Sequence, residues 1–152
     1  MSKELRPSRR ERRTWKKLLV ASLLVTLLVA WFCHLVYQNS LASRLKQQGA
    51  TIQYSGGSVV SVWFRGEDCR FNDSEMASLI WFPQLESLDV DDTQVTNSGL
   101  VHVKDLSQLT RLSVRVRQIT DQREKELKKE MRYLIIQKTQ KIGGRRVVDG
   151  FQ

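Results

Sequence analysis

Histidine and cysteine are scarce in this chain, with two of each among 152 residues. Cys33 lies inside a long apolar run and Cys69 lies outside it, so we expect no disulfide between them. Their spacing is unlike that of a zinc site. His34 and His102 are too far apart in the sequence to be drawn as an acid–base pair or as metal ligands. The sequence therefore predicts no catalytic residues, no metal site and no cofactor, and we interpret the protein as something other than an enzyme.

Charged residues are absent from residues 18–36, a run of 19 positions. As a helix this run would span about 28 Å at 1.5 Å per residue, close to the thickness of the hydrocarbon layer of a bilayer. Trp15 and Tyr37 flank the run, at positions where amphipathic rings favour the membrane interface. We therefore predict a transmembrane helix over residues 18–37.

The charges on the two sides of this run differ. Residues 1–17 are strongly basic, whereas Arg44 and Lys46 are the only charged residues between the run and Arg65. This asymmetry predicts a cytoplasmic basic tail and a single pass through the cell membrane, with the following domain extracytoplasmic. The alternative is a signal peptide cleaved after Ala42, but the apolar core of such a peptide is usually about 7–15 residues long. The length of the run favours an uncleaved signal-anchor.

The formal net charge of +9 is distributed unevenly. Residues 51–100 carry 2 basic and 8 acidic side chains, and residues 101–152 carry 13 basic and 6 acidic ones. Much of the basic excess is explained by the N-terminal tail, so the high isoelectric point does not predict binding to nucleic acid. The basic residues of the segment 125–146 would suit an acidic polymer or anionic lipid headgroups, but such a run is more often a solvated surface, and this is the interpretation that we favour.

Two stretches of the sequence share the apolar pattern L-x-x-L-x-L/V. They occupy residues 85–90 and 109–114, a period of 24 residues. Weaker units at residues 59–64 and 131–136 extend the series to four, with spacings of 26, 24 and 22 residues. A repeat of this kind is typical of a leucine-rich solenoid, in which each unit contributes one strand.

The segments between these units have apolar residues at helical spacing, Met76, Leu79 and Phe82 in one and Leu100, Val103 and Leu106 in the next. A third segment, residues 121–130, keeps only Leu127 and is typical of a solvated helix. Residues 38–58 are expected to contain a helix that stops at Gly49, followed by a capping β-hairpin. The repeats would then occupy residues 59–142, and residues 143–152 would form a loose tail.

The best unit carries a recognisable motif. Its sequence is Thr93-Gln94-Val95-Thr96-Asn97-Ser98-Gly99-Leu100, followed by Val101-His102-Val103-Lys104-Asp105-Leu106. Residues 45–142 resemble the short leucine-rich-repeat proteins of planctomycete-type bacteria. The resemblance implies an α/β fold, a short leucine-rich-repeat solenoid of parallel strands and return helices placed after the transmembrane helix. It implies a binding class and no catalytic residues, and His102 would be structural.

In such a solenoid the residues between the leucines point to one face and form rows across neighbouring strands. The sequence predicts three rows: Arg65, Asp91, Arg115 and Gln137; Trp63, Asp89, Ser113 and Ile135; Ser61, Ser87, Arg111 and Tyr133. Aromatic and arginine side chains are those most enriched at binding hot spots. The candidate protein-binding residues are therefore Trp63, Arg65, Asp89, Asp91, Arg111, Arg115 and Tyr133. The competing interpretation is that the N-terminal hairpin covers Trp63 and the C-terminal tail covers Tyr133 and Ile135.

Two smaller groups of residues have both a functional and a structural interpretation. Carboxylates of Asp89, Asp91 and Asp92 suit calcium or magnesium, but without a calcium-loop glycine we expect solvated carboxylates at strand ends. The small residues Ser22, Thr26 and Ala30 lie four apart in the transmembrane helix and would allow a homodimer, although such residues also occur there by chance.

Together these patterns predict a membrane-anchored leucine-rich-repeat module for protein–protein interaction outside the cytoplasm. Its partner would be a protein that the sequence does not identify. The alternative is a structural, self-associating envelope component, in which the acidic first half of one copy meets the basic second half of another.

Overall fold

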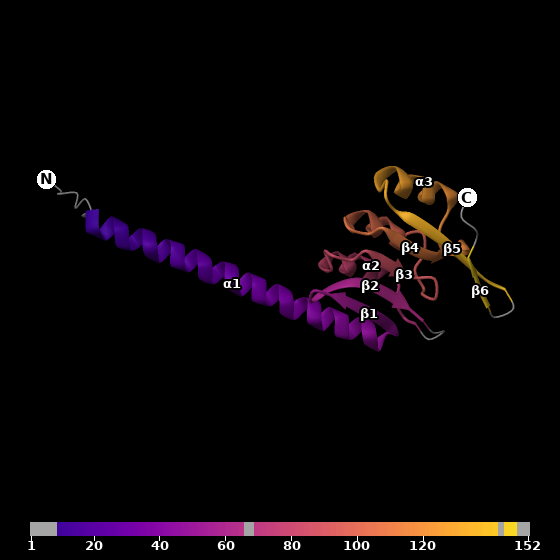
Figure 1. The fold of residues 1–152 in the computed structure, drawn as a ribbon, viewed down its shortest axis with the longest axis horizontal. Helices are drawn as coiled ribbons and strands as arrows, with labels where there is room; N and C mark the ends of the chain where they lie inside the picture. Colours follow the sequence, from indigo (N-terminus) through magenta and orange to yellow (C-terminus); the bar gives the residue numbers. More distant parts are fainter. Residues whose placement is uncertain (1–8, 66–68, 143–144, 149–152) are drawn as a thin grey trace. The chain divides into compact units, whose positions relative to one another are not determined.

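The computed structural model describes the backbone of residues 9–65, 69–142 and 145–148, and the side chains of residues 17–65, 69–141 and 146–148. It is a mixed α/β structure with one long N-terminal helix and an open sheet of six strands (Figure 1). The chain divides into two compact units, Met1–Asn39 and Ser40–Gln152. The predicted α/β class is confirmed.

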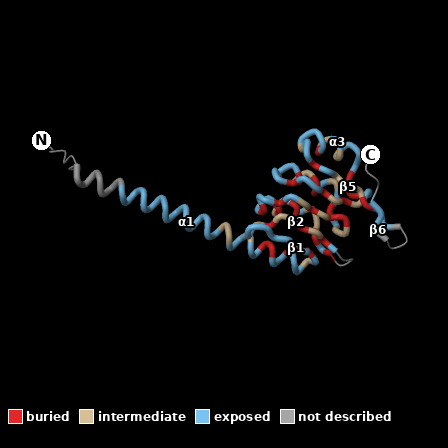
Figure 2. Tube along the Cα trace, viewed as in Figure 1, coloured by how far each residue is buried: buried red, intermediate tan, exposed pale blue. Residues whose placement is uncertain are grey.

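Helix α1 (Arg9–Gln47) contains the charge-free run. Its stretch Lys17–Gln47 is long and apolar enough to cross a membrane. Most large apolar side chains in residues 18–36 are more than half exposed, so a protein core does not surround them (Figure 2). The basic tail was predicted for residues 1–17, and residues 1–8 with the side chains of residues 9–16 lie outside the described residues.

The second unit begins with the last turns of α1. Leu41, Ala42 and Leu45 are buried in the core of this unit, which gives these turns a packing role. The helix ends before Gly49, whose positive φ of 93° is a backbone conformation that favours glycine. The helical continuation and the glycine stop are both confirmed.

A β-hairpin follows the helix. Strand β1 (Ala50–Ser55) pairs antiparallel with β2 (Ser58–Phe64). Gly56 and Gly57 connect them, both with positive φ, which gives a two-residue turn whose twist matches that of the strands. The predicted hairpin is confirmed.

Three further strands run parallel to β2 in chain order: β3 (Ser87–Asp89), β4 (Arg111–Arg115) and β5 (Ile135–Ile142). Strand β6 (Arg145–Val148) pairs antiparallel with β5 and completes the sheet. The register places Val62, Leu88, Leu112 and Ile136 side by side across the parallel strands. Short alternating patterns thus set the pairing, because a slip of one residue would turn every apolar side chain away from the core.

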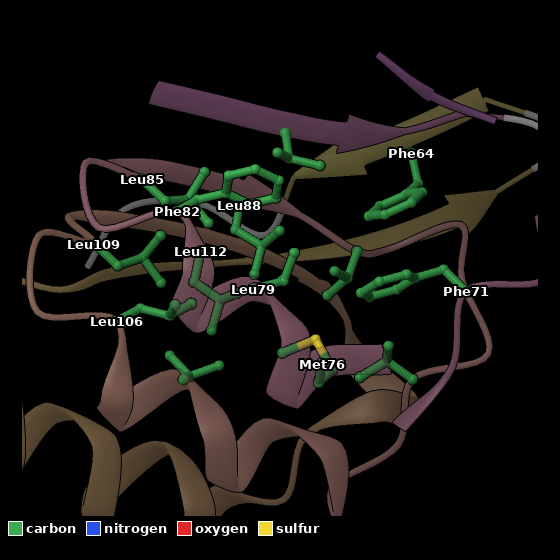
Figure 3. Packing of buried hydrophobic residues seen from close by; sticks show 14 of the residues in the cluster. Phe64, Phe71, Met76, Leu79, Phe82, Leu85, Leu88, Leu106, Leu109 and Leu112 are labelled. Atoms are coloured by element: carbon green, nitrogen blue, oxygen red, sulfur yellow. The ribbon is translucent and has the colours of Figure 1, made fainter. Parts of the chain in front are cut away.

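The segments between the strands cover the apolar face of the sheet. They are α2 (Asp73–Met76) with the 3₁₀ helix η1 (Ala77–Trp81), the 3₁₀ helix η2 (Gly99–Asp105), the short turn η3 (Val116–Gln118) and α3 (Asp121–Glu130). The predicted inward residues of these segments are all buried: Met76, Leu79, Phe82, Leu100, Val103, Leu106 and Leu127. Figure 3 shows several of them packed with leucines of the strands.

The stacked rings of Phe64 and Phe71, with centroids 4.3 Å apart, extend this core toward the end of β2 (Figure 3). Cys69 is buried beside them and unpaired, and burial raises the pKa of its thiol.

Side-chain hydrogen bonds link successive segments at equivalent positions. The Asp73 carboxylate accepts from the backbone N–H and the hydroxyl of Thr96 at 2.6 and 2.5 Å. One unit further on, Asn97 Oδ1 accepts from the backbone N–H and the hydroxyl of Thr120 at 3.3 and 3.2 Å. These bonds confirm that the segments around residues 73, 97 and 121 are equivalent.

Gly99 provides a test of this linkage. A Cβ atom at this position would lie 2.9 Å from Cγ and 3.0 Å from Cα of Asp73, closer than packed atoms approach. Gly99→Ala is therefore expected to push away the residue that holds Thr96 and to lower the free energy of unfolding by about 2 kcal/mol. Urea titration in detergent micelles measures this loss. Ser98→Ala, at an exposed neighbouring position, is the matched control. If the two variants proved equally stable, the tight contact at Gly99 would be contradicted.

The predicted register of the last parallel strand is wrong by two residues. Arg111 lies beside Ile135, where the sequence had placed Tyr133, and Ser113 lies beside Gln137 in place of Ile135. The sequence pattern placed the last unit 22 residues after the preceding one and so matched Ile136 with Val114. The structure instead keeps a spacing of 24 residues and places Ile136 beside Leu112. Because Ile136 is apolar, it fits either of these two apolar positions of the pattern.

The prediction of a loose C-terminal tail is also wrong where the structure describes that region. Strand β5 extends to Ile142, and residues 145–148 form β6. Arg146 of this hairpin forms ion pairs with aspartates that lie far away in the sequence. Residues 143–144 and 149–152 of the predicted tail lie outside the described residues.

Candidate functional site

The side chains that alternate with core residues in β2 to β5 form the second surface of the sheet, called here the open face. One row across it consists of Ser61, Ser87, Arg111 and Ile135, and the next of Trp63, Asp89, Ser113 and Gln137. Two of the three predicted rows are thus confirmed from β2 to β4. The open face carries polar, charged and aromatic groups because its residues occupy the positions that the leucine pattern leaves free.

The C-terminal hairpin curls over the open face. In a flat sheet β6 would lie three strand spacings from β3, roughly 14 Å away. Arg146 of β6 nevertheless contacts two residues of that part of the chain directly, Asp89 at 2.9 Å and Asp91 at 2.8 Å. The sheet must therefore curve so that β6 approaches β3 across the open face.

This curvature encloses a hollow of about 380 Å³. Its floor comes from β3 and β4, and its walls come from β2 on one side and from β5 and β6 on the other. It is lined by Trp63, Arg65, Ser87, Leu88, Asp89, Arg111, Ser113, Gln137, Thr139, Arg146 and Val148. Four of the candidate residues from the sequence are brought together here, Trp63, Arg65, Asp89 and Arg111.

The carboxylates of Asp89, Asp91 and Asp92, called here the acid cluster, lie beside the hollow. Arg146 donates to all three, with the contact to Asp92 at 3.2 Å. Asp92 also pairs with Arg115 at 2.9 Å and with Lys141 at 2.8 Å. The prediction that these carboxylates are solvated is wrong, since the Asp91 side chain is 3% exposed and that of Asp92 10%. Cationic side chains of the protein occupy the position considered for a metal ion.

Burial and charge shift the ionisation of this cluster in opposite directions. Burial, reinforced by repulsion from Asp89, raises the pKa of Asp91 to about 6, although the Thr139 hydroxyl donates to it at 2.9 Å. Burial alone would also raise the pKa of Asp92, but hydrogen bonds and charge from Lys141 and Arg146 hold it below the usual value. The carboxylates outweigh burial at Arg146 and raise its pKa.

The remaining candidate residues lie elsewhere. Arg115 is bound to Asp92, and Asp91 is bound to Arg146, so the predicted alternation of Arg65 with Asp91 is not the pairing that the structure uses. Tyr133 lies in the turn before β5 and is 87% exposed. It lines a different depression together with Lys104 and Arg132.

The interpretation that the N-terminal hairpin covers Trp63 is correct only in part, and the one that the C-terminal tail covers Tyr133 and Ile135 is wrong. Trp63 pairs with Thr51 of the N-terminal hairpin, yet its side chain lines the hollow and is partly exposed. The exposure of Tyr133 shows that the described part of the C-terminal tail does not cover it.

Sequence reasoning missed Thr139 and Arg146, because both were assigned to a loose or solvated region. The signal that could have found Arg146 is its position in a β-branched stretch before Val147 and Val148, which favours a strand.

Comparisons of the chain with protein-family models, with curated proteins and with solved structures find no match. The chemistry of the lining residues therefore indicates what the site can do. The hollow offers guanidinium groups, an indole ring, hydroxyls and one amide, and neither histidine is among its lining residues. Such a set recognises a ligand by charge, stacking and hydrogen bonds.

Proposed function

We propose that this protein is a membrane-anchored, short leucine-rich-repeat module that binds a protein partner through the hollow of its open face. The observation that carries the proposal is the hollow itself, where Trp63 and the arginines gather on adjoining strands. Aromatic and arginine anchors in a concave, partly enclosed site are the usual centre of a protein-binding surface. An enzymatic role has less support, because the lining residues include no histidine and the one carboxylate among them, Asp89, is paired with Arg146.

The leucine-rich-repeat assignment rests on periodicity that sequence and structure share. Positions 62, 88, 112 and 136 face the core in adjacent parallel strands, at spacings of 26, 24 and 24 residues. The linking bonds of Asp73 and Asn97 recur at the same period. These features support the resemblance to short bacterial proteins of this class, in which stacked units share one core.

The membrane anchor in this proposal is the apolar part of α1. Its exposed side chains would be covered by lipid, and the basic N-terminal tail would keep that end in the cytoplasm. The binding unit would then be displayed outside the cytoplasm.

The alternative of charge-driven self-association has fewer groups to draw on. Most carboxylates described in the acidic first half of the second unit already have partners within the chain. The acid cluster pairs with Arg115, Lys141 and Arg146. Asp73 accepts a hydrogen bond from Thr96, and Glu75 accepts one from Gln48. These carboxylates are therefore less available for another copy.

Photo-crosslinking from the floor of the hollow tests the proposed function. A benzophenone amino acid in place of Ser113 is expected to give a discrete protein adduct in intact native cells, because Ser113 lies between β3 and β5 on the floor. The same group in place of the exposed Gln108, outside the hollow, is the matched control. Addition of Trp63→Ala should reduce the Ser113 adduct about tenfold. Equal adducts from both positions, or none from Ser113, would contradict binding through the hollow.

A further inference from the structure

Some of the charged groups that line the hollow form ion pairs within the protein, and others do not. Arg146 is committed to the acid cluster, and Asp89 is committed to Arg146. Arg65 and Arg111 are exposed, and within the described residues neither guanidinium group has a hydrogen bond or an ion pair. The hollow therefore presents two cationic groups that have no partner among the described residues.

The surroundings do not cancel this charge. The lining residues include three arginines against one aspartate, a net charge of +2. The charges of Asp91 and Asp92 beside the hollow are balanced by Arg146, Arg115 and Lys141. The field in the hollow thus favours an anionic occupant, since an enclosed site concentrates the potential of its charges.

The separation of the two arginines indicates the size of that occupant. Arg111 shares a row with Ser61 of β2. Arg65 directly follows β2 and is four residues beyond Ser61, so it lies two strand spacings across and four residues along from Arg111. In sheet geometry the two Cα atoms are roughly 16 Å apart. A single small anion would meet one guanidinium group, whereas two carboxylates about four residues apart on an extended chain, and so on the same side of it, would meet both.

The rest of the lining suits a peptide. Trp63 of β2 offers an apolar surface two residues before Arg65, and Val148 of β6 also lines the hollow. The hydroxyls of Ser87 and Ser113 and the amide of Gln137 line the floor, where they can bond to peptide N–H and C=O groups. A phosphate ion or lipid headgroup would leave the indole and these floor groups without partners.

From this arrangement we infer that the hollow recognises an acidic, extended peptide segment of a partner protein. Two of its carboxylates pair with Arg65 and Arg111, and an apolar side chain between them packs on Trp63. The inference rests on the proposed function and adds to it the chemistry of the partner.

Peptide binding to the full chain in detergent micelles tests this inference. The probe is a short synthetic peptide with one leucine between two glutamates about four residues apart, the spacing that the sheet geometry requires. The readout is the indole N–H resonance of Trp63, assigned with a Trp63→Phe variant. We expect this resonance to shift on titration, and affinity to fall as salt rises. A peptide of the same composition with adjacent glutamates, and one with both replaced by glutamine, should bind roughly tenfold more weakly or not at all.

Variants with a single substitution test whether each arginine contributes to recognition of the acidic peptide. Arg65→Gln and Arg111→Gln are each expected to weaken the binding of the spaced peptide roughly tenfold. Arg132→Gln, at an exposed position outside the hollow, should leave the affinity unchanged and is the matched control. Indole spectra of the free variants that match the wild type show that the fold is kept. Unchanged affinity in both hollow variants would overturn the inference.

The remaining outcomes separate this inference from the proposed function. Equal binding of the acidic and the glutamine peptides, lost only in Trp63→Ala, would overturn the acidic specificity and leave protein binding at the hollow intact. A Trp63 shift with phosphatidylglycerol nanodiscs but with none of the peptides would overturn the peptide and identify a lipid surface. Absence of any peptide shift would overturn the inference, while the crosslink from Ser113 would still report independently on the proposed function.

Discussion

Arg146→Gln is expected to lower the free energy of unfolding by about 3 kcal/mol, because it removes one cation that three carboxylates share. The loss is large since the Asp91 side chain is 3% exposed and would be left without its closest counter-ion. Glutamine retains a similar length and can donate one hydrogen bond, so the change tests charge more than packing. Urea titration in detergent micelles measures the difference.

The same variant should release β6 from the open face. Hydrogen exchange of the amides of Val147 and Val148 is expected to speed up much more than that of Leu112 in the core. Arg132→Gln changes an arginine that lines a different depression and is the control. A loss of stability within about 0.5 kcal/mol of that control would contradict the central role of Arg146.

Stability is expected to increase as the pH falls from about 7 toward 4, with the acid cluster as the cause. The raised pKa of Asp91, about 6 against an ordinary 3.8, means that the folded state binds a proton more readily than the unfolded state. Folding is therefore favoured below the unfolded pKa, and this advantage is lost as the pH rises through the folded one. A shift of this size corresponds to about 3 kcal/mol over the window.

The groups around Asp91 define the lower limit of that window. Asp89, Thr139 and Arg146 contact or face it directly, and Asp92 binds Arg115 and Lys141 beside it. The pKa of Asp92 is held low by its cations, and that of Glu124 is held low by hydrogen bonds from Lys128 and Lys138. Both groups lose stabilisation as they become protonated below their ordinary pKa values, so stability should fall again in stronger acid.

Asp91→Asn isolates the contribution of Asp91. Asparagine keeps an oxygen that can accept from Arg146 and removes the ionisation, so the slope of stability between about pH 4 and 6 should flatten. Urea titrations of both proteins at a series of pH values measure the slope. A variant with the same slope as the wild type would assign the dependence to another group.

The regular part of the fold could be predicted because local patterns determine it. In β2 to β4 the leucine spacing specifies which residues turn inward, and the pairing of Leu88 with Leu112 follows from it. In the last strand the inward set was identified, with Leu134 buried and Ile136 partly buried, but its register was not. Ile136 could match either Leu112 or Val114 of the preceding strand, and the apolar spacing alone does not decide between them, whereas the structure places it beside Leu112.

The candidate site was predicted in part for the same reason. Trp63, Asp89 and Arg111 occupy positions that strand alternation alone assigns to the open face. The wall of the hollow that β6 forms could not be predicted in this way, because Arg146 contacts residues 54 to 57 positions earlier in the chain. Ion pairs of such long range leave no periodic pattern, and a basic, weakly apolar segment is typical of a tail until its partners are known.

The same distance along the chain has a consequence during synthesis. Ribosomes add about 5–20 residues per second, so the carboxylate of Asp92 precedes its partner Arg146 by roughly 3 to 10 s, given the 54 positions between them. For most of that interval the strands already synthesised carry three neighbouring negative charges, with the cations Lys141 and Arg146 still to come. The nascent domain thus passes through an open, self-repelling form, and arrival of the final hairpin converts it into a closed one.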